Sequence, residues 1–173
     1  FDISSDLQEL SHTPMIVVCS GAKSILNLGA TLEYLETMGV PVVGYQTDEL
    51  PGFFARETGL PVDFRVETPM DVITLARKQW TLGLNSTILV VIPPPGKFAI
   101  PRNIVDKYIS IALKDAKEKE VGGSALTPYL LRRINELSEG KSLKVNLELL
   151  KNNARIAARI AFSMHSVFKQ NTI

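Results

Sequence analysis

The feature that most constrains this fold is an alternation of short apolar runs with longer amphipathic stretches. The short runs are rich in β-branched residues and bounded by Gly or Pro, which is typical of buried strands. They cover residues 15–20, 41–45 and 87–92, with a shorter candidate at 63–66. Strands that alternate with helices favour parallel pairing, because each crossover carries a helix over the sheet. The sequence therefore predicts an α/β fold with a mostly parallel sheet flanked by helices.

Apolar residues at helical spacing predict the helices of this fold. They cover residues 22–38, 69–82, 102–120, 127–137 and 142–163. Thr68 and Ser142 are expected to cap two of them, and Pro69 stands at a favoured first-turn position. Because the last three have no strands between them, they form a helical C-terminal segment that covers one face of the sheet or docks on a partner. A length of 173 residues suits a single domain, 1–173.

Composition excludes several classes of protein. One cysteine, Cys19, rules out an intramolecular disulfide framework and a zinc site built from cysteines. A net charge of +1 gives no electrostatic basis for binding nucleic acid, and no apolar run reaches membrane-spanning length. Cys19 is expected to be an inert small hydrophobe inside a buried strand, and Trp80 to lie on a core face.

Ligands of open α/β sheets bind at the carboxyl ends of the strands, and three such ends can be located here. They are followed by residues 20–24, 46–49 and 93–96. Asp48 and Glu49 in the second segment are either an acid/base pair or a polar turn. His12 and His165 have no nearby ligand partner in the sequence, so both are expected to be structural or solvated.

Lys23 is the most notable residue at these ends, because it falls in the first turn of the helix predicted to follow the first strand. The positive end of a helix dipole disfavours an ammonium ion, and a neutral lysine is a nucleophile for imine chemistry with a sugar aldehyde. Free backbone N–H groups beside it would suit a phosphate. The alternative is a solvated surface lysine. A P-loop is excluded, since Ala22 and Val17 occupy its two required glycine positions.

The opening segment, Asp2-Ile3-Ser4-Ser5-Asp6, combines carboxylates with hydroxyls. Hard cations such as magnesium or manganese take oxygen ligands, and serine hydroxyls suit phosphate or sugar contacts. The alternative is a polar turn or a helix cap, which Ser and Asp also favour.

Motifs spread in order over nearly the whole chain resemble pseudouridine-5'-phosphate glycosidases. The matching segments are residues 2–7 (DISSDL), 13–14, 17–26 (VVCSGAKSIL), 31–37, 39–42, 44–45, 47–49, 58–62, 127–131, 142–143 and 152–155. The resemblance implies reversible cleavage of the C–C glycosidic bond of pseudouridine 5'-phosphate to uracil and ribose 5-phosphate, with manganese. It also implies a homotrimer. Neither a nucleic acid polymer nor a membrane is expected as a partner, for the reasons of charge and apolar run length given above.

The resemblance assigns roles to individual residues. Lys23 would attack C1' of the ring-opened sugar and form an imine, and Asp2 would hold the manganese ion. Ser4, Ser5 and Asp6 would contact the substrate, with Asn146 a weaker candidate for such a contact.

The family's general-acid glutamate and a substrate-contacting lysine lie upstream of the Asp-Ile-Ser motif, where this sequence begins with Phe1 rather than Met. We therefore expect the C-terminal part of a longer enzyme, with little turnover by these 173 residues alone. We expect an intracellular protein, cytoplasmic or in an organelle if a targeting segment lies upstream. The alternative function is a non-catalytic sugar-phosphate-binding or interaction module of the same fold.

Overall fold

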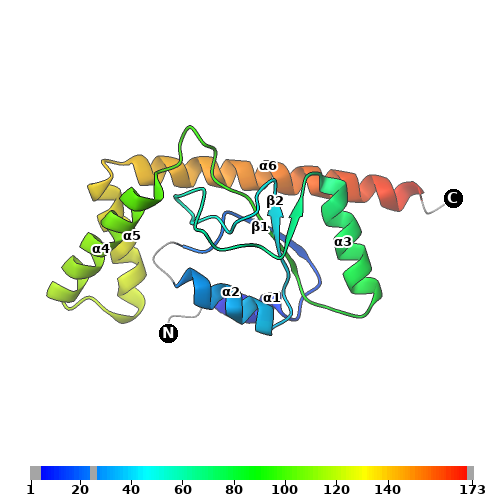
Figure 1. Ribbon diagram of the computed structural model, residues 1–173, viewed down its shortest axis with the longest axis horizontal. Coiled ribbons are helices and arrows are strands. Elements are labelled where there is room, and N and C mark those ends of the chain that lie inside the picture. Colours follow the sequence, from blue (N-terminus) through cyan, green and yellow to red (C-terminus); the bar gives the residue numbers. More distant parts are fainter. Residues whose placement is uncertain (1–4, 24–26, 171–173) are drawn as a thin grey trace.

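The computed structural model describes residues 5–23 and 27–170 of the chain. The elements alternate as the sequence predicts, and helices flank a central sheet (Figure 1). In chain order they are α1 (Ser5–Leu10), β1 (Ile16–Cys19), α2 (Leu28–Thr37), β2 (Val42–Tyr45), β3 (Phe64–Val66), α3 (Pro69–Thr81), β4 (Ile88–Val91), α4 (Arg102–Glu118), a 3-10 turn η1 (Gly123–Ala125), α5 (Leu126–Leu137) and α6 (Lys141–Gln170).

All pairings in the four-stranded sheet are parallel, in the order β1-β4-β2-β3. β4 is central, with Val18 opposite Val90 on one side and Val43 opposite Val90 on the other. β2 and β4 are buried throughout, as their continuous Val and Ile content predicts. The carboxyl ends of the strands therefore meet at one edge of the sheet, which confirms the predicted fold class.

Two apolar layers cover the two faces of the sheet. On one face Leu7 and Leu10 of α1 and Leu35 of α2 pack with Val42 and Leu89. On the opposite face Val72, Ile73 and Ala76 of α3 join Ile156 and Ile160 of α6 over Val43 and Val90. Trp80 packs against this second layer and donates its indole N–H to the carbonyl of Ser86 at 3.1 Å, which confirms its predicted core position.

A third cluster lies beyond the sheet. Ala112 and Ala116 of α4, Leu130 and Ile134 of α5, and Leu149 of α6 form it, together with residues of the loops before α4. The three trailing helices therefore divide their roles. The C-terminal half of α6 covers the sheet, whereas α4 and α5 pack against its N-terminal half.

The boundaries of α3 follow the sequence most closely. The Thr68 hydroxyl accepts from the N–H of Asp71, and the Asp71 carboxylate accepts from the N–H of Thr68. This capping box confirms Thr68 as the N-cap. The hydrogen bonds hold the pKa of Asp71 below its ordinary value, with the Thr68 hydroxyl as the main cause.

Three sequence predictions about elements need correction, and one helix was not predicted. α2 begins at Leu28, not at residue 22, because the Asn27 side chain caps it by accepting from the N–H of Ala30. Ser142 lies inside α6, and its own N–H donates to the Ser138 hydroxyl. The short helix α1 (Ser5–Leu10) is not among the predicted helices, and Ser5 and Asp6 of the opening segment lie in its first turn. β1 is only half-buried, because it is an edge strand.

Candidate functional site

The ends of β1 and β4 lie side by side and define the candidate site. The N–H of Ile92, just after β4, donates to the carbonyl of Cys19 at 2.8 Å. This bond places the loop after β1, residues 20–23, next to the proline-rich loop that begins at Pro93. Two of the three strand ends predicted to carry ligands therefore meet.

Two contacts from distant parts of the chain fix the start of the loop after β1. Ser20 is buried, and its hydroxyl donates to the side-chain oxygen of Asn153 in α6 at 2.9 Å. The carbonyl of Ser20 accepts from the N–H of Phe53 at 3.1 Å. The loop is thus held between α6 and the segment around Phe53, a rigid support for whatever side chain follows.

Gly21 is required in this loop for two reasons. Its φ of +80° lies in the left-handed region, and a Cβ built on it would approach the carbonyl oxygen of Pro51 to 1.8 Å. Only a residue without Cβ lets the two backbones come this close. Gly21 therefore sets the direction in which the chain leaves β1 toward Lys23.

Lys23 follows this turn as an exposed residue, outside any helix. The prediction that it occupies the first turn of a helix is wrong, because Asn27 caps α2 four residues later. The argument from the helix dipole therefore does not apply to it. Lys23 remains at the carboxyl end of β1, where the fold presents ligand-binding groups.

Cys19, the last residue of β1, has an unreactive thiol. Although the residue as a whole is half-exposed, burial of its thiol raises the pKa to about 11. A thiol with such a pKa is protonated at neutral pH and is a poor nucleophile. This confirms the expectation of an inert small side chain.

The carboxylates after β2 serve the structure of their loop. Glu49 accepts from the N–H groups of Thr58 and Gly59 at 3.1 and 2.7 Å, and Asp48 pairs with Arg65 at 2.5 Å. Of the two interpretations of this pair, the structure supports the polar turn. The two histidines are structural or solvated, as expected. His12 Nδ1 lies 3.0 Å from the carbonyl of Gln8 at the end of α1, and His165 is exposed.

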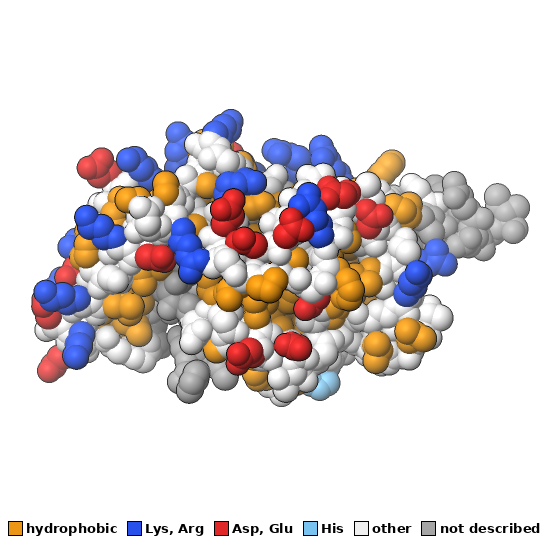
Figure 2. All heavy atoms as spheres, viewed as in Figure 1, with side chains coloured by type: hydrophobic (Ala, Val, Ile, Leu, Met, Phe, Trp, Pro, Cys, Tyr) orange, Lys and Arg blue, Asp and Glu red, His pale blue; other side chains and the backbone are white. Residues whose placement is uncertain are grey.

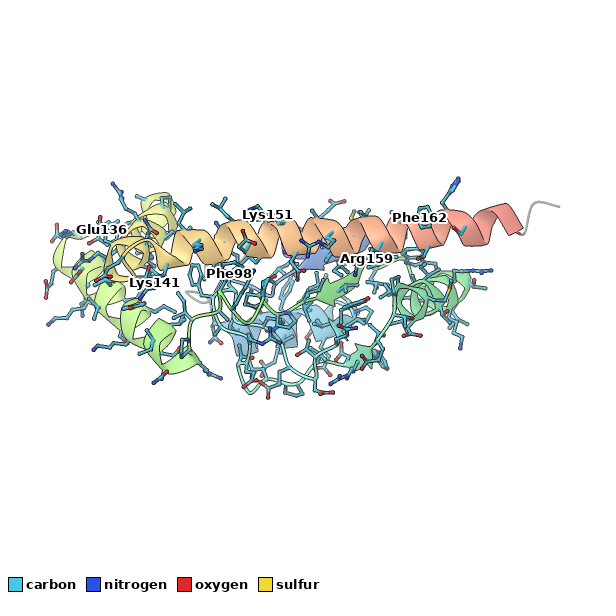
Figure 3. The ribbon with its side chains drawn as sticks, turned by 90° about the horizontal axis from the view of Figure 1, so that it is seen from above. Phe98, Glu136, Lys141, Lys151, Arg159 and Phe162 are labelled. Carbon is cyan, nitrogen blue, oxygen red and sulfur yellow. The ribbon has the colours of Figure 1, made fainter. Side chains whose placement is uncertain are left out.

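Positive charge collects around the loop that follows β4. Arg56 donates to the carbonyl of Pro94 at 2.8 Å, and the ammonium groups of Lys97 and Lys144 lie 4.7 and 5.5 Å from the centre of the Phe98 ring. The pKa of Glu148 is lowered, mainly by a hydrogen bond from Lys151 and further by Lys97 and Arg155. Lys and Arg side chains line the upper margin in Figure 2, and Phe98 lies beside α6 in Figure 3. Such a cluster suits an anionic ligand.

The structure describes the predicted substrate contacts only in part. Asp2 and Ser4 lie outside the described residues, and Ser5 and exposed Asp6 begin α1. Asn146 is a half-buried residue of α6, one heptad before Asn153 and hence on the same helix face. Asn153 also belongs to the candidate site, although the sequence assigned it no role there. Its heptad spacing from Asn146 was the available signal.

Manganese remains a prediction. Within residues 5–23 and 27–170 no group of three or more His, Cys, Asp or Glu side chains is arranged to hold a metal ion. The expected ligand Asp2 belongs to the part outside these ranges, while Asp48 and Glu49 are engaged elsewhere.

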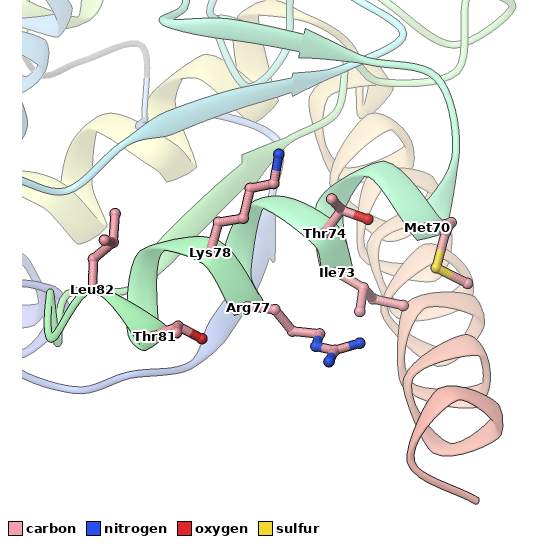
Figure 4. Close-up of a pocket in the computed structure, with 7 residues that line it drawn as sticks. All are labelled: Met70, Ile73, Thr74, Arg77, Lys78, Thr81 and Leu82. Carbon is pink, nitrogen blue, oxygen red and sulfur yellow. The ribbon is translucent and has the colours of Figure 1, made fainter. Parts of the chain in front are cut away.

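A surface hollow of about 490 Å³ lies along α3 and is a poor candidate for the site (Figure 4). All its lining residues come from α3 and its C-cap: Met70, Ile73, Thr74, Arg77, Lys78, Thr81 and Leu82. Among the residues that the structure describes, none of the strand-end loops and no second element contributes to its lining. No helix in the described part of the chain has the length and hydropathy to cross a membrane.

The fold and the loops define an α/β protein with a candidate ligand site at the carboxyl end of a parallel sheet. A family model described as "Indigoidine synthase A like protein" matches residues 1–163. The chain therefore belongs to the indigoidine synthase A-like family.

Curated relatives named pseudouridine-5'-phosphate glycosidase confirm the resemblance stated from the sequence. The protein of Caldanaerobacter subterraneus subsp. tengcongensis is 50% identical over 98% of this chain and 55% of its own length. That of Petrotoga mobilis is 50% identical over 93% of this chain and 53% of its own length. The chain thus spans about half the length of the curated relatives it matches.

Solved structures agree on the fold. The prealnumycin C-glycosynthase AlnA, solved in complex with ribulose 5-phosphate, superimposes with a TM-score of 0.91 at 36% identity, covering 98% of this chain and 56% of that one. An indigoidine synthase A-like protein of Thermotoga maritima gives 0.83 at 37% identity, covering 92% of this chain and 53% of that one.

Proposed function

We propose that this chain supplies the lysine-bearing part of a pseudouridine-5'-phosphate glycosidase. The observation that carries the proposal is the 50% identity to a protein of that name over 98% of the chain. The position of Lys23 at the carboxyl end of β1 supports it. The ligand of the C-glycosynthase, ribulose 5-phosphate, indicates that a sugar phosphate is accommodated by a fold of this kind.

In the proposed reaction the sugar ring opens, and the amine of Lys23 adds to C1'. The C1'–C5 bond then breaks, its electron pair stays with the base, and a proton added at C5 gives uracil. The nitrogen lone pair forms an iminium ion with C1', which makes this carbon–carbon bond cleavable. Water hydrolyses the iminium ion to ribose 5-phosphate and restores the lysine.

The residues around Lys23 have separate roles in this proposal. Gly21, Ser20 and Asn153 are positioning residues, because they fix the loop that carries the nucleophile. Arg56 and Lys97 supply positive charge for the 5'-phosphate. Ser4, Ser5, Asp6 and Asn146 are proposed substrate contacts. Asp2 is the proposed manganese ligand, and the ion would supply a positive charge beside the substrate. The proton for ring opening has no donor assigned in this chain.

Borohydride reduction in the presence of ribose 5-phosphate tests the nucleophile. We expect one reduced sugar-phosphate adduct per chain, located by peptide mass spectrometry on Lys23 and lost in Lys23→Arg. Lys114 is an exposed lysine of α4 and an internal control for non-specific labelling. Adducts spread equally over Lys23 and Lys114 would contradict the assignment. Binding of ribose 5-phosphate without an adduct would instead support the non-catalytic sugar-phosphate-binding module.

A further inference from the structure

The two edges of the sheet are built differently. β3 forms one edge and has only three residues, with the charged Arg65 at its centre paired to Asp48 and Glu67. Short, charged edge strands discourage further pairing. β1 forms the other edge and consists of four uncharged residues, Ile16–Cys19, without proline. Nothing in the sequence of β1 protects its edge.

The free side of β1 can be identified from the hydrogen-bond pattern. The carbonyls of Met15 and Cys19 accept from the N–H groups of Ile88 and Ile92 on the β4 side. Alternate residues of a parallel strand bond to opposite neighbours, so Ile16 and Val18 direct their N–H and C=O groups away from β4. We call these groups the β1 edge. In the described part of the sheet β1 pairs with β4 alone.

The side chains of β1 also lack cover on this side. Every residue of β2 and β4 is buried, whereas all four residues of β1 are half-buried. They nevertheless contact the same apolar layers, since Ile16 and Val18 pack against the layer formed with Ile156 and Ile160 of α6. A strand that touches both cores but remains half-exposed has a side without a neighbouring strand among residues 5–23 and 27–170.

α6 lies over β1 and carries a second apolar face. Its inner face buries Val145, Leu149, Ile156 and Ile160. A row of exposed residues on the opposite side follows the spacing i, i+4, i+7, i+11, i+15 and i+18, which places them on one helix face about 27 Å long. These residues, the α6 stripe, are Leu143, Leu147, Leu150, Ala154, Ala158 and Ala161. The three leucines are between 51% and 55% exposed.

The length of the relatives indicates what covers these surfaces. The matched 170 residues make up 55% of the Caldanaerobacter protein, so about 140 of its residues lie outside the match, the size of a domain. The solved C-glycosynthase gives the same proportion, since 56% of its chain is covered. A polypeptide of this size is long enough to add strands to the sheet and to cover a helix.

We propose that the β1 edge and the α6 stripe form the docking surface for the polypeptide that corresponds to this remaining part of the relatives. It adds a strand beside β1 through the backbone groups of Ile16 and Val18, and it buries the leucines of the α6 stripe. The inference rests on family membership and on the structure, and not on the proposed glycosidase activity.

The test is co-expression of this chain with the part of the Caldanaerobacter protein outside the matched residues. We expect a one-to-one complex by light scattering. In the complex, hydrogen exchange at the amides of Ile16 and Val18 slows by at least tenfold. The amides of Val17 and Cys19 face β4 and are protected with or without the occupant.

Matched variants test the α6 stripe. The double variant Leu147→Lys/Leu150→Lys is expected to weaken the complex at least tenfold, because two exposed leucines lose their burial. Leu113→Lys, a control on α4 with a leucine that is also exposed, is expected to leave the affinity within twofold. Circular dichroism of the uncomplexed variants checks that both remain folded.

Three results would overturn the proposal. They are the absence of a complex, a complex in which Ile16 and Val18 exchange as before, and equal affinities for the double variant and the control. Protection of Ile16 and Val18 in a dimer of this chain alone would assign the edge to a second copy and would equally overturn it.

Discussion

Substitution of Gly21 by alanine isolates the energetic role of the turn that leads to Lys23. The added Cβ would approach the Pro51 carbonyl oxygen to 1.8 Å, in a backbone with φ of +80°. Gly83, after α3, has the same φ of +80°, and nothing lies within 4 Å of a Cβ there. Gly83→Ala is therefore a control with the same backbone strain and no steric clash.

The magnitudes follow from the separate contributions. A left-handed φ destabilises a residue that has a Cβ by about 1–2 kcal/mol. Alanine also has less conformational freedom than glycine in the unfolded chain, which stabilises the folded state by about 0.4–1 kcal/mol. Both contributions are shared by the two variants and cancel in their difference. The clash in Gly21→Ala adds the cost of forcing packed backbones apart, about 1–3 kcal/mol. We therefore expect Gly21→Ala to be more destabilising than Gly83→Ala by that amount.

The measurement is urea denaturation followed by far-UV circular dichroism, with the free energy of unfolding extrapolated to water. Similar slopes against urea would show that both variants unfold from comparably compact states. If the free energies of unfolding of the two variants differ by less than about 0.5 kcal/mol, the Cβ added at residue 21 does not clash with Pro51 as expected, and the reasoning is refuted.

Three further outcomes are expected. Thr68→Ala should cost about 1 kcal/mol of unfolding free energy at pH 7 in urea titrations. Because hydrogen bonds from Thr68 lower the pKa of Asp71, part of this stabilisation is present above about pH 4 and is lost as the pH falls. Cys19 should react with iodoacetamide at pH 8 roughly a hundred times more slowly in the folded chain than in urea, since burial raises its pKa to about 11; equal rates by mass spectrometry would contradict this. Asn153→Ala should cost about 1–3 kcal/mol, because it leaves the buried Ser20 hydroxyl without its partner; an unchanged urea midpoint would show that the hydrogen bond is dispensable.

The elements that could be predicted from the sequence are those whose signals are local. β2 is a short apolar run that follows Pro41, β4 is a β-branched run stopped by the prolines from Pro93 onward, and α3 begins with a capping box contained in Thr68–Asp71. In each case the residues that decide the structure lie within a few positions of one another. Neighbouring side chains and backbone preferences are then sufficient to fix the element.

The remaining features depend on contacts between distant residues. The start of α2 was placed too early because apolar spacing continues upstream of Asn27, and spacing alone does not show which polar residue caps the helix. The edge position of β1 results from the strand order, which places β4 between β1 and β2. The bond between Ser20 and Asn153 joins residues 133 positions apart, so no local pattern reports it.

The same strand carries the proposed nucleophile and the unprotected edge. β1 ends at Cys19, and Lys23 lies four residues further along a loop that α6 holds through Asn153. A strand added beside Ile16 and Val18 would therefore run next to this loop, and α6 contributes both to the support of the loop and to the apolar stripe. A partner bound at the β1 edge thus borders the site at Lys23. Under the two proposals together, one active site is divided between two segments of polypeptide, and the junction between them is the strand from which the proposed nucleophile emerges.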